Sequence, residues 1–267
     1  MEPAPIARTP LVDGHTHVDQ YDPGELPGLL ERAQAAGVGL IIAAGTSLAS
    51  CARVLELAGS HPSIRAGLGL HPADLEGPWS DATEAALRAM ASHPGVVEWS
   101  ECGLDYMPGS PERGVQQDAL RQQVRLARGF GLPLVVHSRE ADEDTWRILA
   151  EEHAEEVGGA WHYFGGTLEQ AERAFDLNFR VSLAKPLTRE PALQAMAAHL
   201  PLERVVIETD SYPQPFKKNR QRWTEPWHLP QVVEALAAAQ GVEPEAVAQA
   251  TTAGYLAMLG ERAPVLG

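Results

Sequence analysis

The feature that most constrains the fold is a two-part unit, a short apolar run followed by a stretch with helical periodicity. The unit recurs along the whole chain, and its apolar runs are residues 11–15, 39–44, 64–70, 96–101, 133–137, 159–162, 179–183 and 204–208. Runs without polar alternation predict parallel strands that are covered on both faces. Eight such units in 267 residues are typical of an α/β fold, the TIM-like (β/α)8 barrel.

Helical periodicity separates the runs and also continues after the last one. The predicted helices are 26–36, 48–59, 82–92, 113–129, 140–155, 168–176, 190–199 and 227–240, with an extra C-terminal helix at 244–259. Gly37, Gly59 and Gly129 stand where C-cap glycines are expected. The chain contains no linker-like segment, so we predict one domain over 1–267, with loose ends at 1–9 and 262–267.

Charge and cysteine content narrow the function classes. The formal net charge of −15 argues against nonspecific adhesion to nucleic acid or to an anionic membrane. A phosphate-bearing substrate stays possible, because a metal ion reverses the local field. We find no secretory signal and no apolar run long enough for a membrane span. Cys51 and Cys102 are predicted to be free thiols, which indicates a cytoplasmic protein.

Metal-binding residue types fall at the ends of the predicted strands. In a parallel barrel these carboxyl ends lie on one side and build the site. A lone histidine there is usually a core residue, and a lone carboxylate is usually a helix cap. Imidazoles and carboxylates that converge on one mouth instead suit Zn²⁺, Mn²⁺ or a similar ion. The predicted metal ligands are His15, His17, Glu101, His137, His162 and Asp210.

Two acidic residues and a pair of glycines near this site also need an interpretation. Glu98 falls inside a run that should be dry, and we expect it to form an ion pair with the helical layer. Asp105 either hydrogen-bonds a ligand histidine or caps the following helix. The Gly67-x-Gly69 pair lacks the rest of a dinucleotide fingerprint and indicates tight packing before His71.

A basic segment with flanking aromatic residues, 216–223, follows Asp210. The loop after the eighth strand of a barrel is a common place for phosphate binding. Its cations would follow a nucleic acid backbone while Phe216 or Trp223 stacks on a base; the alternative is a solvated surface loop. Arg139 and Lys185 are further candidates for phosphate contact. The predicted phosphate contacts in the segment are Lys217, Lys218, Arg220 and Arg222.

Several motifs, in this order along the chain, resemble those of the TatD family of metal-dependent hydrolases, within the amidohydrolase-like barrels. They are Val12-Asp13-Gly14-His15-Thr16-His17, Gly69-Leu70-His71-Pro72, Glu101-Cys102-Gly103-Leu104-Asp105-Tyr106, Val136-His137-Ser138-Arg139, His162-Tyr163-Phe164-Gly165-Gly166 and Glu208-Thr209-Asp210-Ser211. Two departures from the family pattern concern substrate preference: Tyr212 stands before Pro213, and Thr251-Thr252-Ala253 precedes Tyr255.

The resemblance implies two divalent metal ions (Zn, Mn or Mg) and distributes the ligands between them. His71 would lie beside the pocket, on substrate phosphate. Glu101 would bridge both ions. The implied ligands are His15, His17, Glu101 and Asp210 for one ion, and Glu101, His137 and His162 for the other.

The resemblance also implies a deoxyribonuclease that cleaves phosphodiester bonds. We expect a metal-bound hydroxide to attack phosphorus, with Asp210, Glu101 and His71 as catalytic residues. The expected partner is single-stranded DNA or DNA ends, in DNA repair or degradation, and the protein is expected to be a monomer. Two alternatives remain: a D-aminoacyl-tRNA deacylase or another metal-dependent ester or amide hydrolase, and a non-catalytic metal-binding scaffold.

Overall fold

A single sheet of eight parallel strands forms the centre of the computed structural model, which describes residues 5–266 apart from the side chain of Gln221. Each strand pairs with the next in the chain, so the spatial order is the sequence order. The strands are β1 (Leu11–Thr16), β2 (Val38–Ala44), β3 (Ile64–Gly67), β4 (Val96–Asp105), β5 (Leu134–Arg139), β6 (Gly159–Trp161), β7 (Phe179–Leu183) and β8 (Val205–Ile207). Every one overlaps a predicted apolar run.

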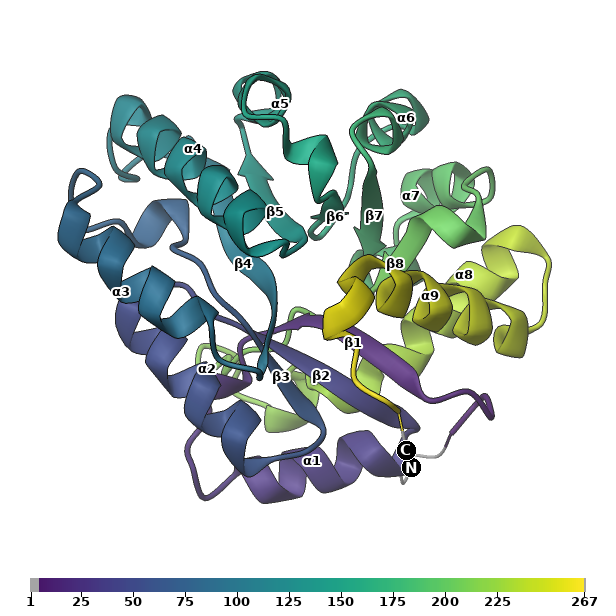
Figure 1. Ribbon diagram of the computed structural model, residues 1–267. Coiled ribbons are helices and arrows are strands. Elements are labelled where there is room, and N and C mark those ends of the chain that lie inside the picture. Colours follow the sequence, from purple (N-terminus) through teal and green to yellow (C-terminus); the bar gives the residue numbers. More distant parts are fainter. Residues whose placement is uncertain (1–4, 267) are drawn as a thin grey trace.

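The sheet curls until its first strand meets the chain that follows its last strand. Thr16 pairs with Ser211 in an isolated parallel bridge. The amide of His17 donates to the Ser211 carbonyl at 2.8 Å, and the amide of Asp210 donates to the His15 carbonyl at 3.0 Å. The result is a nearly closed barrel of the TIM type, as predicted (Figure 1).

Helices surround the strands and cover the outer face of the sheet (Figure 1). They are α1 (Leu26–Ala35), α2 (Leu48–Ser60), α3 (Asp81–Ala91), α4 (Arg113–Phe130), α5 (Asp142–Glu151), α6 (Leu168–Asp176), α7 (Pro191–Ala197), α8 (Leu229–Gln240) and α9 (Pro244–Leu259). The main apolar core lies between sheet and helices. A second apolar cluster joins inner-face residues such as Val12 and Val135 to Tyr255 of α9, the predicted extra helix.

The ends of some elements differ from the prediction. Gly37 follows α1 with a φ of +88°, as a C-cap glycine does. Gly59 and Gly129, in contrast, lie inside α2 and α4. Helix α4 ends at Gly131, which has a φ of +63°. The helical pattern alone could not distinguish these glycines, because only the left-handed conformation of the capping residue requires glycine.

Helix α9 closes the barrel floor through Tyr255. A Cβ atom on Gly14 would lie 2.3 Å from Cε2 of Tyr255, so only glycine allows this approach. The Tyr255 hydroxyl donates to the Gly14 carbonyl at 2.7 Å and lies 2.6 Å from Oε2 of Glu98. Burial raises the pKa of Glu98 to about 8.

The expected ion pair of Glu98 with the helical layer is therefore wrong. Its partner does come from a helix, but that partner is the neutral hydroxyl of Tyr255. A hydroxyl carries one proton, which the Gly14 carbonyl already accepts. We infer that neutral Glu98 donates a hydrogen bond from Oε2 to the tyrosine oxygen, which pairs Oε2, the hydroxyl and the Gly14 carbonyl without a charge.

The predicted tight packing at Gly69 is confirmed. A Cβ atom there would lie 2.7 Å from the amide nitrogen of Glu101 and 2.8 Å from its carbonyl oxygen. The chain after β3 thus passes directly against the backbone of β4. This contact brings His71 next to Glu101.

The described parts of the two end segments contact the barrel. The Thr9 hydroxyl donates to Glu245 at 2.8 Å, and Arg262 donates to the Val96 carbonyl at 3.1 Å. Cys51 and Cys102 are buried free thiols, as predicted. Among residues 5–266, no helix is long and apolar enough to cross a membrane. The organisation of 1–267 as one domain stays a prediction.

Candidate metal centre

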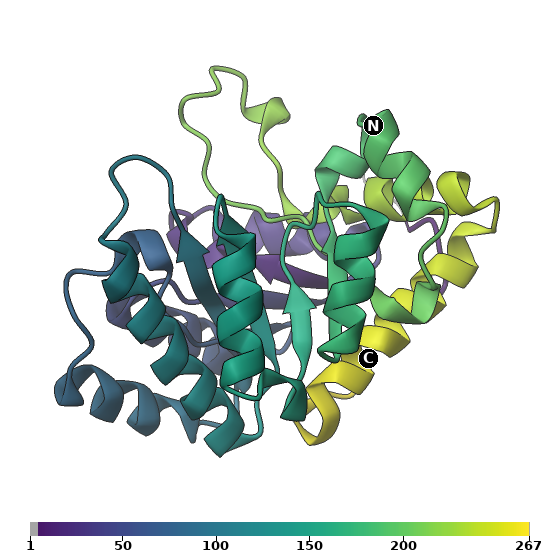
Figure 2. The same ribbon diagram turned by 90° about the horizontal axis from the view of Figure 1, so that it is seen from above.

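The predicted ligands meet at the carboxyl ends of the strands, on the side toward which the strand arrows point (Figure 2). His15 lies in β1, and His17 directly follows that strand. Glu101 and His137 lie in β4 and β5. His162 follows β6, and Asp210 follows β8. Six side chains from the ends of five strands therefore lie near the mouth of the barrel, in overlapping groups of three, one of which also includes His71.

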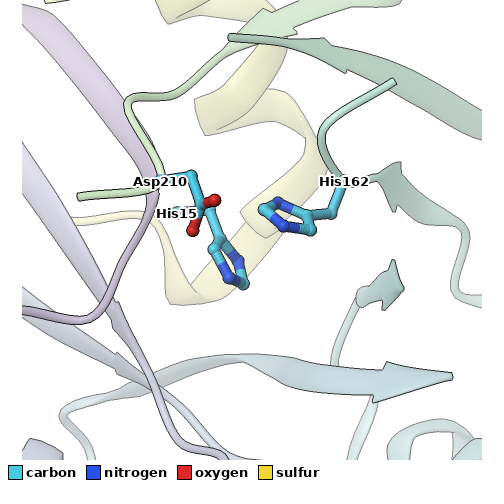
Figure 3. A group of neighbouring side chains, drawn as sticks. All are labelled: His15, His162 and Asp210. Carbon is cyan, nitrogen blue, oxygen red and sulfur yellow. The ribbon is translucent and has the colours of Figure 1, made fainter. Parts of the chain in front are cut away.

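One oxygen of the Glu101 carboxylate faces the histidines of the first strand. Oε2 lies 3.3 Å from Nε2 of His15 and 3.6 Å from Nε2 of His17. Nε2 of His17 also lies 3.5 Å from Oδ1 of Asp210. The donor atoms of His15, His17 and Glu101 all lie within 4.8 Å of one another, as do those of His15, His162 and Asp210. Figure 3 shows the last three side chains pointing toward one another.

The other carboxylate oxygen of Glu101 faces a different set of imidazoles. Oε1 lies 2.9 Å from Nδ1 of His137 and 3.7 Å from Nε2 of His162. It also lies 3.7 Å from Nε2 of His71, so this distance alone does not distinguish His71 from His162 as a metal ligand. A carboxylate whose two oxygens face separate imidazole sets has the geometry of a bridging ligand.

Polar partners hold the far side of the ligand imidazoles. Nε2 of His137 lies 3.2 Å from Oδ2 of Asp105, and Nδ1 of His162 lies 2.7 Å from Oε1 of Glu208. A carboxylate accepts a hydrogen bond from the ring nitrogen it faces, which leaves the other nitrogen directed at the centre, where it can bind a cation. Nε2 of His15 is buried without a hydrogen-bond partner. These donors fit a metal ion.

His71 differs from the ligand histidines, because the nitrogen that carries its proton faces the centre. Its Nδ1 accepts a hydrogen bond from the amide of Ala73 at 3.1 Å. A neutral imidazole that accepts at Nδ1 carries its proton on Nε2, the nitrogen that faces Glu101. Burial lowers the pKa of His71, which favours this neutral form. His71 therefore presents a hydrogen-bond donor to the centre, where the ligand histidines present lone pairs.

The electrostatics of the cluster favour a bound cation. Burial alone would raise the pKa of Glu101, but His15 and His162 lower it well below its ordinary value. Burial lowers the pKa of His15 to about 4 and raises that of Asp210 to about 6. Although burial opposes it, Glu208 and Glu101 raise the pKa of His162 to about 10. A cation would take the place of that proton, so binding should release it.

Glu208 is a site residue that the sequence analysis missed. Besides facing His162, its carboxylate accepts hydrogen bonds from the amide of Tyr163 at 2.8 Å and from the hydroxyl of Ser182. It is fully buried, and His162 lowers its pKa against the effect of burial. The available signal was a second carboxylate at the end of the eighth apolar run, two residues before Asp210. Of the two roles considered for Asp105, contact with a ligand histidine is present.

Two members of the basic segment are engaged in contacts within the protein. Arg220 lies 3.1 Å from Oε1 of Glu225 and 3.6 Å from Oε2 of Glu25. Its guanidinium carbon stands 3.9 Å from the ring centroid of Trp223. The Trp223 indole donates to the Lys217 carbonyl at 3.2 Å. Arg220 and Trp223 thus support the loop itself.

Three further side chains of the segment, Phe216, Lys218 and Arg222, are exposed to solvent. Phe216 is 69% exposed, and Lys217 is half-buried. Figure 2 shows the loop after β8, in yellow-green, projecting from the carboxyl side of the barrel. Arg139 is exposed at the end of β5, next to His137.

Comparisons with known proteins identify the family of the chain. A family model described as "TatD related DNase" matches residues 12–260. The chain is 34% identical over 252 residues to the "Uncharacterized metal-dependent hydrolase YabD" of Bacillus subtilis (strain 168), covering 91% of this chain and 96% of that protein. It is 31% identical over 222 residues to the "3'-5' ssDNA/RNA exonuclease TatD" of Edwardsiella piscicida, covering 80% and 85%.

A solved structure has the same architecture. The crystal structure of YjjV, a TatD homologue from Escherichia coli K12, superposes with a TM-score of 0.85 at 30% sequence identity. The match covers 94% of this chain and 98% of that one. The similarity therefore extends over almost the whole length of both chains.

Proposed function

Because the chain belongs to the family of TatD-related DNases, which are metal-dependent hydrolases, we propose that it hydrolyses phosphodiester bonds of DNA. The observation that carries the proposal is the Glu101 carboxylate, whose two oxygens face separate sets of imidazoles. A relative named as an exonuclease of single-stranded DNA and RNA supports nucleic acid as the substrate class. The substrate in this proposal is single-stranded DNA or a DNA end.

The proposal includes two divalent ions, Zn²⁺, Mn²⁺ or Mg²⁺. His15, His17, Glu101 and Asp210 would hold one, and Glu101, His137 and His162 the other. Imidazole nitrogens and carboxylate oxygens suit Zn²⁺ and Mn²⁺ in particular. His71 is left out of both sets, because its tautomer directs a proton toward the centre.

Bound divalent ions lower the pKa of water and stabilise negative charge on phosphoryl oxygens. The protein supplies proton transfer and positioning. Asp210, with a pKa of about 6, is ionised at neutral pH and accepts the proton of the attacking water. His71 donates a hydrogen bond from Nε2 to a phosphoryl oxygen. Asp105 and Glu208 fix the rings of His137 and His162.

Cationic side chains outside the centre bind the remaining phosphates of the strand in this proposal. Lys217, Lys218 and Arg222 on the projecting loop, together with Arg139 beside the centre, keep this role. Arg220 is not assigned a role in phosphate binding, because its guanidinium is already paired with Glu225. A monomer suffices for this scheme, since all proposed ligands come from one chain.

The test is cleavage of end-labelled single-stranded DNA by protein that is first stripped of metal and then reloaded with one ion at a time. We expect cleavage only after reloading, and we expect Asp210→Asn to lower the rate by roughly 10²–10⁴-fold. Asp118→Asn, the same change at an exposed position on α4, serves as the control. Anomalous diffraction from Zn²⁺- or Mn²⁺-soaked crystals counts the ions.

A parallel assay with D-aminoacyl-tRNA separates the proposal from the ester-hydrolase alternative, because the same ions also polarise a carbonyl group. Deacylation in the absence of DNA cleavage would replace the proposed substrate. Cleavage that persists at the wild-type rate in Asp210→Asn would remove this residue from the mechanism. Absence of any metal-dependent turnover would leave only the scaffold alternative.

A further inference from the structure

A pocket of about 500 Å³ adjoins the metal centre at Asp210, on the side of β7 and β8. Segments that follow three successive strands, β6, β7 and β8, contribute to its wall. The side chains that line it include four cations and two exposed aromatic rings: Lys185, Arg189, Lys217, Arg222, Tyr163 and Phe216.

The charge of this pocket is opposite to that of the whole chain. The formal net charge is −15, yet four cationic side chains line the pocket. Among the described residues that line it, Asp210 is the one carboxylate. The convergence of positive side chains on one hollow, without matching carboxylates, fits an anionic ligand.

Lys185 shows most clearly that the cationic side chains of the pocket lack negatively charged partners. Its ammonium nitrogen lies 3.3 Å from the hydroxyl of Thr224, a neutral group. Burial, together with the nearby charges of Lys217 and Arg189, lowers the pKa of Lys185. Lys217 in turn is held 2.6 Å from the amide oxygen of Gln214. An anion in the pocket would offset the repulsion between these like charges.

Arg189 and two aromatic rings complete the opening. Arg189 is exposed, and its nearest ion-pair contact is a 3.8 Å approach to its neighbour Glu190, which is also exposed. Such a pair holds a guanidinium weakly. Tyr163 is 43% exposed and Phe216 is 69% exposed, although both are large and mostly apolar. Exposed rings beside a cationic groove are typical of sites that stack nucleobases.

We infer that this pocket is a subsite for a second phosphate, the neighbour of the scissile phosphate along the DNA strand. The inference rests on the proposed function and deepens it. A strand whose scissile phosphate lies at the metal centre carries its next phosphate one nucleotide away, and the pocket begins at Asp210, a member of the centre. Lys185 and Arg189 bind this second phosphate, while Tyr163 or Phe216 stacks on the adjoining base.

The experiment compares chromogenic substrates that differ in one phosphate. The first pair is thymidine 5′-(p-nitrophenyl phosphate) with and without a 3′-phosphate. The second pair is thymidine 3′-(p-nitrophenyl phosphate) with and without a 5′-phosphate, so both strand polarities are covered. With the metal-loaded wild type, we expect the added phosphate to lower KM at least about tenfold in one pair, as a charge-assisted hydrogen bond allows.

Lys185→Ala and Arg189→Ala should each remove most of this advantage and leave kcat for the substrates with one phosphate unchanged. Lys185→Arg, which keeps the charge, should retain it. Arg88→Ala removes a positive charge from the exposed face of α3 and serves as the control. Calorimetric binding of thymidine 3′,5′-bisphosphate and of thymidine 5′-monophosphate to the metal-loaded protein gives a readout that needs no turnover.

The outcomes separate the two proposals. Equal KM values within both pairs in the wild type would overturn the subsite, and so would an advantage that survives both alanine substitutions. Absence of hydrolysis for every substrate would count against the proposed function instead. In that case calorimetry decides on the subsite: it stands if the bisphosphate binds at least about tenfold more tightly than the monophosphate and Lys185→Ala removes the difference, and it falls otherwise.

Discussion

Two of the three buried carboxyl groups of strand β4, those of Glu98 and Glu101, lie three residues apart and behave in opposite ways. Glu98 has no exposed surface and Glu101 is 3% exposed. Burial raises the pKa of Glu98 to about 8. Burial acts on Glu101 in the same direction, but the imidazoles of His15 and His162 outweigh it and lower the pKa well below its ordinary value.

The difference shows that neighbours, and not depth, decide which buried carboxyl is charged. Glu98 faces a tyrosine hydroxyl on the barrel floor and stays neutral. Glu101 faces imidazoles at the mouth and stays ionised. One strand thus provides a neutral group that holds the floor together and a charged group that suits a cation.

The largest effect should come from replacing Glu101 with glutamine. Glu101→Gln preserves size but removes the charge between the imidazoles, so we expect loss of bound metal and a rate lower by roughly 10²–10³-fold. Metal content by mass spectrometry and DNA cleavage measure it. Glu98→Gln is the matched control on the same strand and should keep its metal. Full metal content in Glu101→Gln would break the comparison.

The second-largest effect is expected in the pH dependence of the unfolding free energy, which should differ between the wild type and Glu98→Gln. The pKa of Glu98 is about 8 in the folded protein and near the ordinary value of 4.5 in the unfolded chain. Its neutral form therefore stabilises the fold fully below pH 4.5, and this contribution is lost as the pH rises toward 8. Relative to Glu98→Gln, the wild type should lose a few kcal/mol between pH 5 and pH 8, at about 1.4 kcal/mol per pKa unit. Urea unfolding of both proteins at several pH values measures the difference, and parallel profiles would contradict the neutral state of Glu98.

The smallest of the three effects concerns the partner of Glu98. Tyr255→Phe removes the hydroxyl that joins Glu98 to the Gly14 carbonyl and leaves buried polar groups unpaired, which should cost about 1–3 kcal/mol of unfolding free energy. A double-mutant cycle with Glu98→Gln measures the coupling between the two side chains. Strictly additive costs would mean that the hydrogen bond contributes nothing of its own.

The sequence was sufficient to predict the positions of the strands and the convergence of the ligands. Strands that are buried on both faces form apolar runs that can be recognised in the sequence. A parallel barrel brings their carboxyl ends together independently of the conformation of the loops. Strand ends were less predictable. Strand β4 was expected to end at Glu101 and continues to Asp105, because its backbone stays paired with β5 as far as Asp105 and Arg139.

Contacts between distant segments were beyond the sequence. The partner of Glu98 is Tyr255, which lies 157 positions later in the sequence. The residues around Glu98 do not predict this contact. Arg220 was predicted to bind phosphate because it stands in a basic run, but Glu25, in the loop before α1, helps to hold it. The tautomer of His71 depends on the local turn at Ala73, a geometry that residue types alone do not fix.

The meeting of Thr16 with Ser211 has a consequence for how the protein is made. His17 and Asp210 flank this junction, so the cluster draws on both the first strand and the segment after the last one. A nascent chain on the ribosome exposes its histidines early but has no Asp210 until most of the polypeptide has emerged. The complete set of candidate ligands therefore exists only at the end of translation, and a product truncated before β8 would lack Asp210.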